Sequence, residues 1–225
     1  MKMPPPLIVF DLDGTLVDTA PDLIGTLNVV FDREGIAPLP FDEARAMIGG
    51  GVKALLERGL RAHGATFTPE DLDGLFKTYL KLYADAIADR SRPFPGLLPA
   101  LDELKERGCT FAVCTNKLEW LSVRLLDQLQ LTDRFAAVCG QDTFGKPKPD
   151  PEMFRRTVSR AGGEVSRAIM VGDSRTDVDT ARAAGVPVVA VDFGYTETPV
   201  ELLSPDRIIS HFDELPPIAA ELLQL

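Results

Sequence analysis

The chain has 225 residues, a formal net charge of −10 at pH 7 and 45% hydrophobic residues. This length suits one large domain, or one domain with a smaller insert, and the apolar content is sufficient for a sizeable core. The acidic balance argues against nucleic acid and anionic membrane surfaces as partners, because both attract basic patches. An acidic protein that handles an anionic substrate therefore needs local positive charge, from a metal ion or from a few lysines and arginines.

The sequence contains three cysteines, Cys109, Cys114 and Cys139, an odd number without a zinc-binding spacing. We expect them to be reduced core thiols, as in an intracellular, cytoplasmic protein. No segment approaches the roughly 18 apolar residues of a membrane span, and the N-terminal residues lack a signal-peptide pattern. The sequence leaves open whether the protein is a monomer or a homodimer.

The first predicted strand covers residues 7–10 and runs directly into Asp11-Leu12-Asp13-Gly14-Thr15. In extended backbone, residues i and i+2 point to the same side, so the carboxylates of Asp11 and Asp13 aim into one small volume. Two such carboxylates repel each other unless a cation lies between them, and Mg²⁺ prefers oxygen ligands of this kind. The same pair also suits a nucleophilic carboxylate beside one that transfers protons.

A helical block of about 75 residues follows and contains no good strand. Apolar spacing and breaks at glycine and proline predict three helices in it, at 21–34, 52–63 and 69–89. We interpret residues 17–92 as an all-helical cap inserted into a core formed by 1–16 and 93–225.

Short apolar runs and helical patterns alternate through the rest of the chain. Strands are predicted at 110–114, 136–139, 168–171, 188–191 and 207–209, and helices at 97–107, 118–129, 151–161 and 176–184. Nearly continuous apolar strands are typical of a parallel sheet buried on both faces. The predicted fold class is therefore α/β: a doubly wound, Rossmann-like, mostly parallel sheet with the helical cap inserted.

Polar residues follow the strands at the edge of the sheet where open α/β folds bind ligands. Asp173 follows the strand at 168–171 and adds a third carboxylate. Together with Asp11, the backbone carbonyl of Asp13 and water molecules, it predicts an octahedral Mg²⁺ site. Asp177, one helical turn later, is either a further ligand or a residue that fixes Asp173 or a metal-bound water.

Thr115 and Asn116 follow the strand at 110–114, just before a helix. A hydroxyl and free backbone N–H groups at a helix start favour a phosphate, so we expect both residues to contact the substrate.

Two lysines follow the strand at 136–139, in the run Lys146-Pro147-Lys148-Pro149-Asp150. The prolines stiffen this run into an extended shape, so alternate residues point in opposite directions and only one lysine faces inward. An inward lysine would neutralise both a nucleophilic carboxylate and an incoming phosphoryl group.

These residues resemble the motifs of the haloacid dehalogenase-like hydrolase superfamily, in order and over essentially the whole chain. Asp11-Leu12-Asp13-Gly14-Thr15 resembles the family's first motif, and Thr115 resembles the second. Lys146, in the pattern Lys-Pro-x-Pro, resembles the third motif, and Gly172-Asp173-Ser174 with Asp177 resembles the fourth. In the family's third motif the lysine precedes the first proline, which selects Lys146 over Lys148 here. The helical block resembles the family's small cap.

The resemblance implies a phosphoryl transfer through an aspartyl phosphate. It assigns Asp11 as the nucleophile and Asp13 as the group that protonates the leaving oxygen and then activates water. Mg²⁺ and Lys146 would offset negative charge throughout. The presence of Asp13 argues against the family's dehalogenases, which lack this aspartate. Thr15 argues against its sugar-phosphate mutases, which usually carry a branched apolar residue at this position. Together the two residues favour a phosphatase.

The cap loop Ile48-Gly49-Gly50-Gly51 resembles that of the family's phosphoglycolate phosphatases. This implies that 2-phosphoglycolate is hydrolysed to glycolate and phosphate, with the amides of Gly50 and Gly51 holding the carboxylate. Arg45 and Arg58, close to this loop, are interpreted as surface charges. The alternatives are a sugar-phosphate phosphatase or mutase, a pyrophosphatase, or a phospho-accepting signalling domain.

Overall fold

The computed structural model describes residues 4–195 and 198–225. Its largest sheet has six strands in the order β5-β4-β1-β6-β7-β8, and every neighbouring pair is parallel. The strands are β1 (Leu7–Phe10), β4 (Thr110–Cys114), β5 (Ala137–Cys139), β6 (Ala168–Gly172), β7 (Val188–Val191) and β8 (Arg207–Ile209). The predicted parallel α/β sheet is confirmed, with each strand within one residue of its expected bounds.

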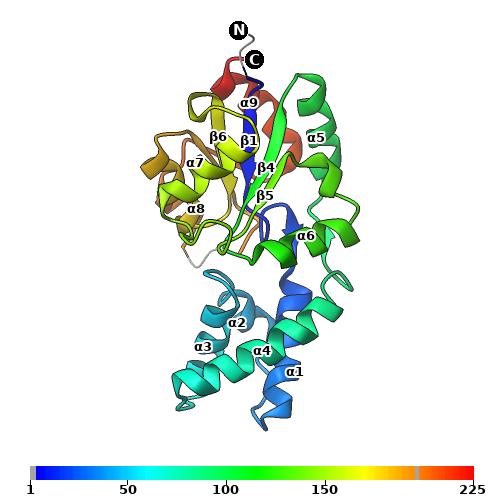
Figure 1. The fold of residues 1–225 in the computed structure, drawn as a ribbon, viewed down its shortest axis with the longest axis vertical. Helices are drawn as coiled ribbons and strands as arrows, with labels where there is room; N and C mark the ends of the chain where they lie inside the picture. Colours follow the sequence, from blue (N-terminus) through cyan, green and yellow to red (C-terminus); the bar gives the residue numbers. More distant parts are fainter. Residues whose placement is uncertain (1–3, 196–197) are drawn as a thin grey trace.

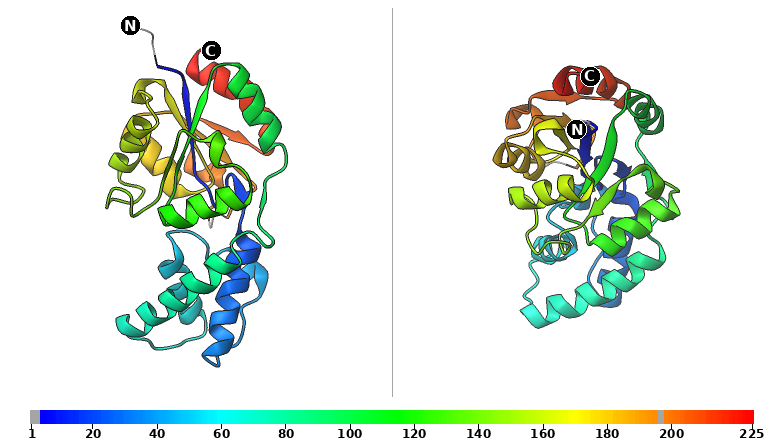
Figure 2. Two further views of the ribbon diagram at one scale, coloured as in Figure 1. Left: turned by 45° about the vertical axis from the view of Figure 1, so that its right-hand side comes forward. Right: turned by 45° about the horizontal axis from the view of Figure 1, so that its top comes forward.

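Helices cover both faces of this sheet (Figures 1 and 2). Helices α7 (Pro151–Arg160) and α8 (Arg175–Ala184) pack on one face, and α5 (Leu97–Glu106), α6 (Glu119–Gln128) and α9 (Leu215–Leu223) belong to the other. Short 3₁₀ helices lie at Thr132–Arg134, Val165–Arg167, Val200–Leu203 and Phe212–Glu214. Helix α9 was not predicted, and the other four helices match the expected pattern to within one or two residues at each end.

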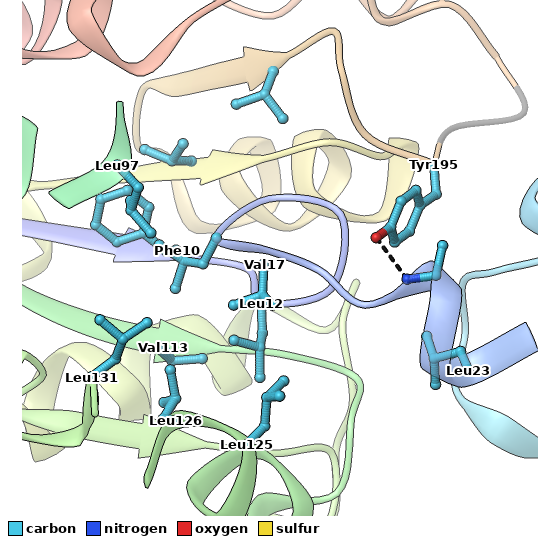
Figure 3. Close-up of a cluster of buried hydrophobic side chains, with 14 of the residues drawn as sticks. Phe10, Leu12, Val17, Leu23, Leu97, Val113, Leu125, Leu126, Leu131 and Tyr195 are labelled. Carbon is cyan, nitrogen blue, oxygen red and sulfur yellow. Dashed lines mark hydrogen bonds between the residues drawn. The ribbon is translucent and has the colours of Figure 1, made fainter. Parts of the chain in front are cut away.

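The two faces of β1 show why this sheet forms. All four of its side chains are fully buried, with Leu7 and Val9 in one apolar cluster and Ile8 and Phe10 in the other. Figure 3 shows Phe10 among side chains of the larger cluster, including Leu97, Val113 and Leu126. A continuous apolar strand is therefore required, because neither face of β1 meets water.

Four helices lie between two very short strands and form a separate group beyond the carboxyl edge of the sheet (Figure 1). We call this group the cap: α1 (Ala20–Arg33), α2 (Phe41–Arg45), α3 (Val52–Ala62) and α4 (Pro69–Asp85). The flanking strands β2 (Val17–Asp18) and β3 (Arg92–Pro93) pair antiparallel. The expected helices of the cap are found, whereas α2, β2 and β3 are too short to leave a periodic pattern. The division of the chain at residues 17 and 92 stays a prediction.

The sequence predicted buried, reduced cysteines and no membrane-spanning segment. All three cysteines are buried and none forms a disulfide. Within residues 4–195 and 198–225, no helix combines the length and the apolar character needed to cross a bilayer.

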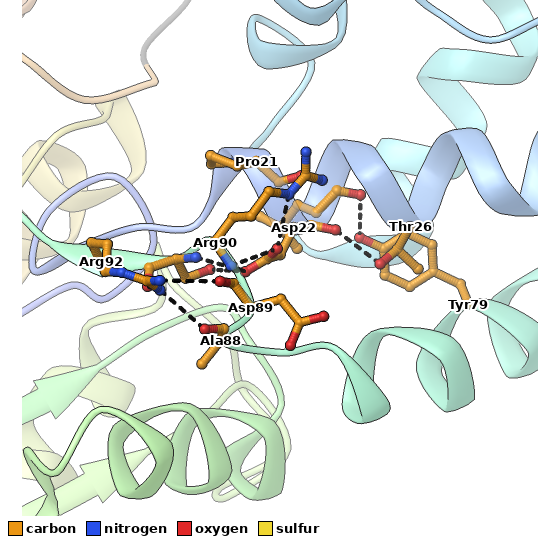
Figure 4. A network of polar contacts seen from close by, with 10 residues as sticks. Pro21, Asp22, Thr26, Tyr79, Ala88, Asp89, Arg90 and Arg92 are labelled. Atoms are coloured by element: carbon orange, nitrogen blue, oxygen red, sulfur yellow. Dashed lines mark hydrogen bonds and ion pairs between the residues drawn. The ribbon is translucent and has the colours of Figure 1, made fainter.

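Asp22, near the start of α1, binds the segment that leads from α4 back to the sheet (Figure 4). Its residue is only 3% exposed, and its carboxylate accepts hydrogen bonds from the backbone N–H groups of Arg90 and Ser91. The Ser91 hydroxyl donates to it at 2.7 Å as well, and the Arg90 Nε lies 3.4 Å away. One side chain at the start of α1 thus satisfies several donors on the segment that leads back to the core.

We expect Asp22→Ala to destabilise the protein by about 2–3 kcal/mol, because buried donors around the carboxylate lose a charged acceptor. Urea unfolding of the variant and of the wild type measures this difference. Asp32→Ala, at an exposed position on the same helix, is the matched control and should change the free energy of unfolding by less than about 0.5 kcal/mol. Equal effects of the two substitutions would contradict this account of Asp22.

Candidate active site

The turn after β1 places Asp11 and Asp13 at the carboxyl edge of the sheet. The backbone N–H of Asp11 donates to the Val171 carbonyl at 2.9 Å, which carries the register of β1 and β6 one residue further. Gly14 follows with φ = +82°, and a Cβ there would lie 2.4 Å from Asp173 Oδ2. Both the backbone conformation and the close approach therefore require glycine at this position.

Three carboxylates meet at this edge. One oxygen each from Asp11, Asp173 and Asp177 lies within 4.8 Å of the others. Asp173 accepts a hydrogen bond from the Tyr195 N–H at 2.7 Å and one from the Thr15 hydroxyl at 3.3 Å. The oxygen donors, their burial and their spacing fit a hard divalent cation. The predicted convergence of these residues is thus observed, and the group is able to hold a metal ion.

Crowding of these carboxylates changes their proton affinity. Burial, helped by the charge of Asp177, raises the pKa of Asp11 to about 6, although Lys148 opposes the shift. Burial and the charges of Asp177 and Asp11 raise the pKa of Asp173 to about 8. Without a cation the site therefore holds protons that acidic side chains normally release.

Lys148 supplies positive charge inside this cluster. Its side chain is 1% exposed, and its Nζ lies 3.0 Å from Asp11 Oδ1 and 2.6 Å from Asp177 Oδ1. Burial alone would lower the pKa of Lys148, but the two carboxylates outweigh burial and raise it above the ordinary value of a lysine. The ammonium therefore stays charged beside Asp11.

The prediction that Lys146 faces the site is wrong. Its side chain is 59% exposed and lies 3.6 Å from Asp150, on the surface. The pattern Lys-Pro-x-Pro occurs twice in overlap, and the second copy, starting at Lys148, ends at Pro151, where α7 begins. The expectation that only one of the two lysines points inward holds, but both copies fit the pattern, and the inward lysine belongs to the second copy.

Asn116 fixes the backbone of this lysine. Its Nδ2 donates to the Lys148 carbonyl at 3.0 Å, and its Oδ1 accepts from the Lys148 N–H at 2.9 Å. Both polar ends of the amide are used in this way, so its predicted contact with substrate stays a prediction. Thr115, the preceding residue, is 2% exposed, accepts a hydrogen bond from the Lys117 N–H and lines a cavity that Asp11 and Lys148 also border.

Asp13 points toward a different lysine, which the sequence analysis did not single out. Lys117 Nζ lies 3.0 Å and 3.2 Å from the two carboxylate oxygens of Asp13. Asp13 therefore adds no carboxylate to the three-aspartate group, and its predicted backbone ligand role stays a prediction. Nothing in the local sequence links the two residues, which are 104 positions apart.

A cavity of about 340 Å³ opens between these residues and the cap. Gly49–Gly51 and the first residue of α3 line its cap side, while Asp11, Asp13 and Lys148 line the core side. A Cβ on Gly51 would lie 3.3 Å from the Asn116 carbonyl, so this loop closely approaches the core. The loop reaches the site as predicted, whereas the binding of a carboxylate by Gly50 and Gly51 stays a prediction.

Two cap arginines are not the plain surface charges that the sequence suggested. Arg58 donates to the carbonyls of Met47 and Gly49 at 2.7 Å and 2.9 Å, which fixes the glycine loop. Arg45 donates to the carbonyls of Phe193 and Gly194 in the core, and its guanidinium lies 5.0 Å from the ring centre of Tyr195. These contacts link the cap to the loop that carries the Tyr195 N–H.

The raised pKa values predict how stability depends on pH without metal. A carboxyl whose folded-state pKa is raised contributes stability below its unfolded pKa, near 4, and loses it as pH rises through the folded value. In a chelator, thermal stability should therefore fall from about pH 4 to about pH 8, with the contribution of Asp11 lost by about pH 6 and that of Asp173 by about pH 8. Asp173→Asn should flatten this dependence, as measured by thermal unfolding across pH 4–9.

Added Mg²⁺ should reverse the loss, since it binds the ionised carboxylates and competes with protons. At 100 times its dissociation constant it would stabilise the wild type by about 2.7 kcal/mol, with the effect larger at pH 8.5 than at pH 5.5. An Asp173→Asn variant that kept the full Mg²⁺ effect would contradict the assignment of this group.

The chain is similar to known proteins over most of its length. The family of haloacid dehalogenase-like hydrolases matches residues 8–191. The phosphoglycolate phosphatase of Caulobacter vibrioides is 50% identical over 216 residues, covering 96% of this chain and 91% of that protein. That of Mesorhizobium japonicum is 46% identical, covering 97% and 96%. A crystal structure of a predicted phosphoglycolate phosphatase from Haemophilus somnus 129pt superposes with a TM-score of 0.87 at 27% identity, over 94% of this chain and 96% of that one. The chain belongs to the haloacid dehalogenase-like hydrolase family.

Proposed function

We propose that this protein is a Mg²⁺-dependent phosphomonoesterase that hydrolyses 2-phosphoglycolate to glycolate and phosphate through an aspartyl phosphate on Asp11. The observation that carries the proposal is the position of Asp11. Its carboxylate lies 3.0 Å from the buried ammonium of Lys148, belongs to the three-aspartate group and lines the cavity under the cap. A nucleophilic carboxylate, a cation and a metal site at one point suit the transfer of a dianionic phosphoryl group.

The size of the cavity supports a small substrate. Ligand cavities commonly measure about 300–1,000 Å³, and this one measures about 340 Å³. Its cap wall begins with Gly49–Gly51 and the N-terminus of α3, where backbone N–H groups favour an anion. A two-carbon substrate with a phosphate at one end and a carboxylate at the other would fit between Asp11 and this loop. The relatives named phosphoglycolate phosphatase, which match this chain over 91% and 96% of their own length, support the same substrate.

In the first step, an oxygen of Asp11 attacks phosphorus, and the bond between phosphorus and the ester oxygen breaks. Asp13 gives a proton to that oxygen, so glycolate leaves as an alcohol. Lys148 offsets the negative charge that gathers around Asp11 and the transferred group, and Thr115 offers its hydroxyl to a phosphoryl oxygen.

In the second step, Asp13 takes a proton from a water molecule that attacks phosphorus. The bond between phosphorus and Asp11 breaks, which releases inorganic phosphate and restores both carboxyl groups to their starting states. Lys148 again balances charge on the leaving carboxylate of Asp11.

Asp11 and Asp173 are the side chains that we propose to ligate Mg²⁺. When bound, the ion would supply positive charge to the phosphoryl oxygens and to the carboxylates that ligate it. Both oxygens of Asp177 already have partners, since Oδ1 accepts from Lys148 and Oδ2 from the Ser174 N–H and hydroxyl. This favours Asp177 as a residue that orients its neighbours over a direct ligand.

A pair of lysine substitutions tests the corrected assignment. Lys148→Met should lower kcat/KM for 2-phosphoglycolate by about 10²-fold or more, the usual effect of removing a charge-stabilising group from an active site. Lys146→Met, two residues away and exposed, is the matched control and should stay within about two-fold of the wild type. Steady-state kinetics at saturating Mg²⁺ measures both variants. Comparable losses in the two would contradict the role of Lys148.

A substrate panel tests the proposed reaction. Purified protein with Mg²⁺ should release phosphate from 2-phosphoglycolate with a kcat/KM at least about ten-fold above that for hexose phosphates and pyrophosphate, a margin of roughly 1.4 kcal/mol. Asp11→Asn should keep the fold, as judged by circular dichroism, and lose turnover on every substrate.

Three outcomes would contradict the proposal. Equal activity across the panel would remove the assignment of 2-phosphoglycolate. Release of one equivalent of glycolate, with the phosphoryl group retained on the protein, would favour a phospho-accepting signalling domain. Substantial turnover by Asp11→Asn would remove Asp11 as the nucleophile.

A further inference from the structure

Lys117 is a buried cation at the edge of the cavity that neither the sequence motifs nor the proposed reaction uses. It follows Thr115 and Asn116 after β4, its side chain is 3% exposed, and it lines the cavity. It pairs with Asp13, just as Lys148 pairs with Asp11, so each of the two neighbouring aspartates has its own ammonium partner.

The contacts of Lys117 use all three of its N–H donors. Nζ lies 3.0 Å and 3.2 Å from the two oxygens of Asp13, and 2.8 Å from the hydroxyl of Tyr83. It also lies 4.5 Å from the centre of the Tyr83 ring. Contact with both carboxylate oxygens restricts rotation of the Asp13 carboxyl group more than a single hydrogen bond would.

The tyrosine that holds this lysine comes from the cap. Tyr83 lies on α4 and is fully buried, and its ring centre is 5.8 Å from that of Tyr79, one turn earlier. The Tyr79 hydroxyl donates to the Leu23 carbonyl of α1 at 2.9 Å. Arg124 of α6 donates to the Ala84 carbonyl at 2.8 Å, which ties this end of α4 to the core. Tyr83 therefore lies between a contact to α1, made through Tyr79, and a contact to α6 of the core, made through its neighbour Ala84.

We propose that Lys117, anchored by Tyr83 of the cap, is a positioning residue that aims the Asp13 carboxyl group at the leaving oxygen. This inference rests on the proposed function of Asp13 as the proton donor. A carboxyl group free to rotate would spend less time in hydrogen-bond reach of that oxygen, so proton transfer would slow while attack by Asp11 continued. The arrangement also makes the acid/base step depend on a cap residue.

The test uses two substrates of similar size whose leaving groups differ in their need for a proton. Ethyl phosphate leaves as an alkoxide, which needs protonation, whereas acetyl phosphate leaves as a stable carboxylate, which does not. Neither carries the carboxylate of 2-phosphoglycolate. The quantity compared is kcat/KM, because it reports the steps up to the first irreversible one, formation of the aspartyl phosphate.

Lys117→Met should lower kcat/KM for ethyl phosphate and 2-phosphoglycolate by about 10–100-fold, part of the 10²–10⁴-fold that general acid catalysis provides, and that for acetyl phosphate by less than about three-fold. Tyr83→Phe removes only the hydroxyl. It should lower kcat/KM for ethyl phosphate and 2-phosphoglycolate by about three- to ten-fold, with a smaller effect on that for acetyl phosphate. Lys81→Met, at an exposed position of the same helix two residues from Tyr83, is the matched control and should leave kcat/KM for all three substrates unchanged.

Asp13→Asn separates failure of this inference from failure of the proposed function. If Asp13→Asn slows ethyl phosphate and acetyl phosphate equally, Asp13 is not the proton donor and the proposed mechanism fails. If Asp13→Asn slows ethyl phosphate more than acetyl phosphate, but Lys117→Met and Tyr83→Phe slow both equally, the positioning role of Lys117 fails and the proposed function of Asp13 stands. Loss confined to 2-phosphoglycolate in Lys117→Met would instead make Lys117 a ligand of the substrate carboxylate and overturn the inference. Should Lys117→Met not fold, Tyr83→Phe decides the question.

Discussion

Repulsion between carboxylates at the carboxyl edge of the sheet is the constraint around which this site is built. Oxygens of Asp11, Asp173 and Asp177 lie within 4.8 Å of one another in a buried place. Such a group is stable only with nearby positive charge or bound protons. Lys148 supplies one charge directly, and the raised pKa values of Asp11 and Asp173 show that more is needed. The group is therefore suited to a metal ion, which would supply that additional charge.

The same constraint explains how the cap and the sheet are joined. Asp13 would add a further charge to the group, but Lys117 draws it aside, and Tyr83 of the cap holds that lysine. Arg45 of the cap reaches the loop before Tyr195, whose N–H donates to Asp173. Contacts between the cap and the core are thus also contacts that arrange the charged residues of the site.

Much of the fold and part of the site follow from local sequence. The six strands are apolar throughout because both sheet faces are covered, and this pattern requires no tertiary information. Asp11 and Asp173 directly follow two such strands, β1 and β6, that pair in parallel, so their convergence follows from topology. Elements without a periodic pattern, such as β2 and β3, were not predicted, since two residues cannot show a period.

By itself, the sequence determined which carboxylates share one edge, because Asp11 and Asp173 directly follow apolar runs that identify themselves as strands. Only the tertiary structure decided which lysines meet them. Lys148 faces inward because the amide of Asn116, 32 residues away, binds its backbone, and Lys117 reaches Asp13 across 104 residues. The direction of a long, flexible side chain depends on partners that are distant in the chain. For that reason two overlapping Lys-Pro-x-Pro patterns could not be distinguished until the fold brought those partners together.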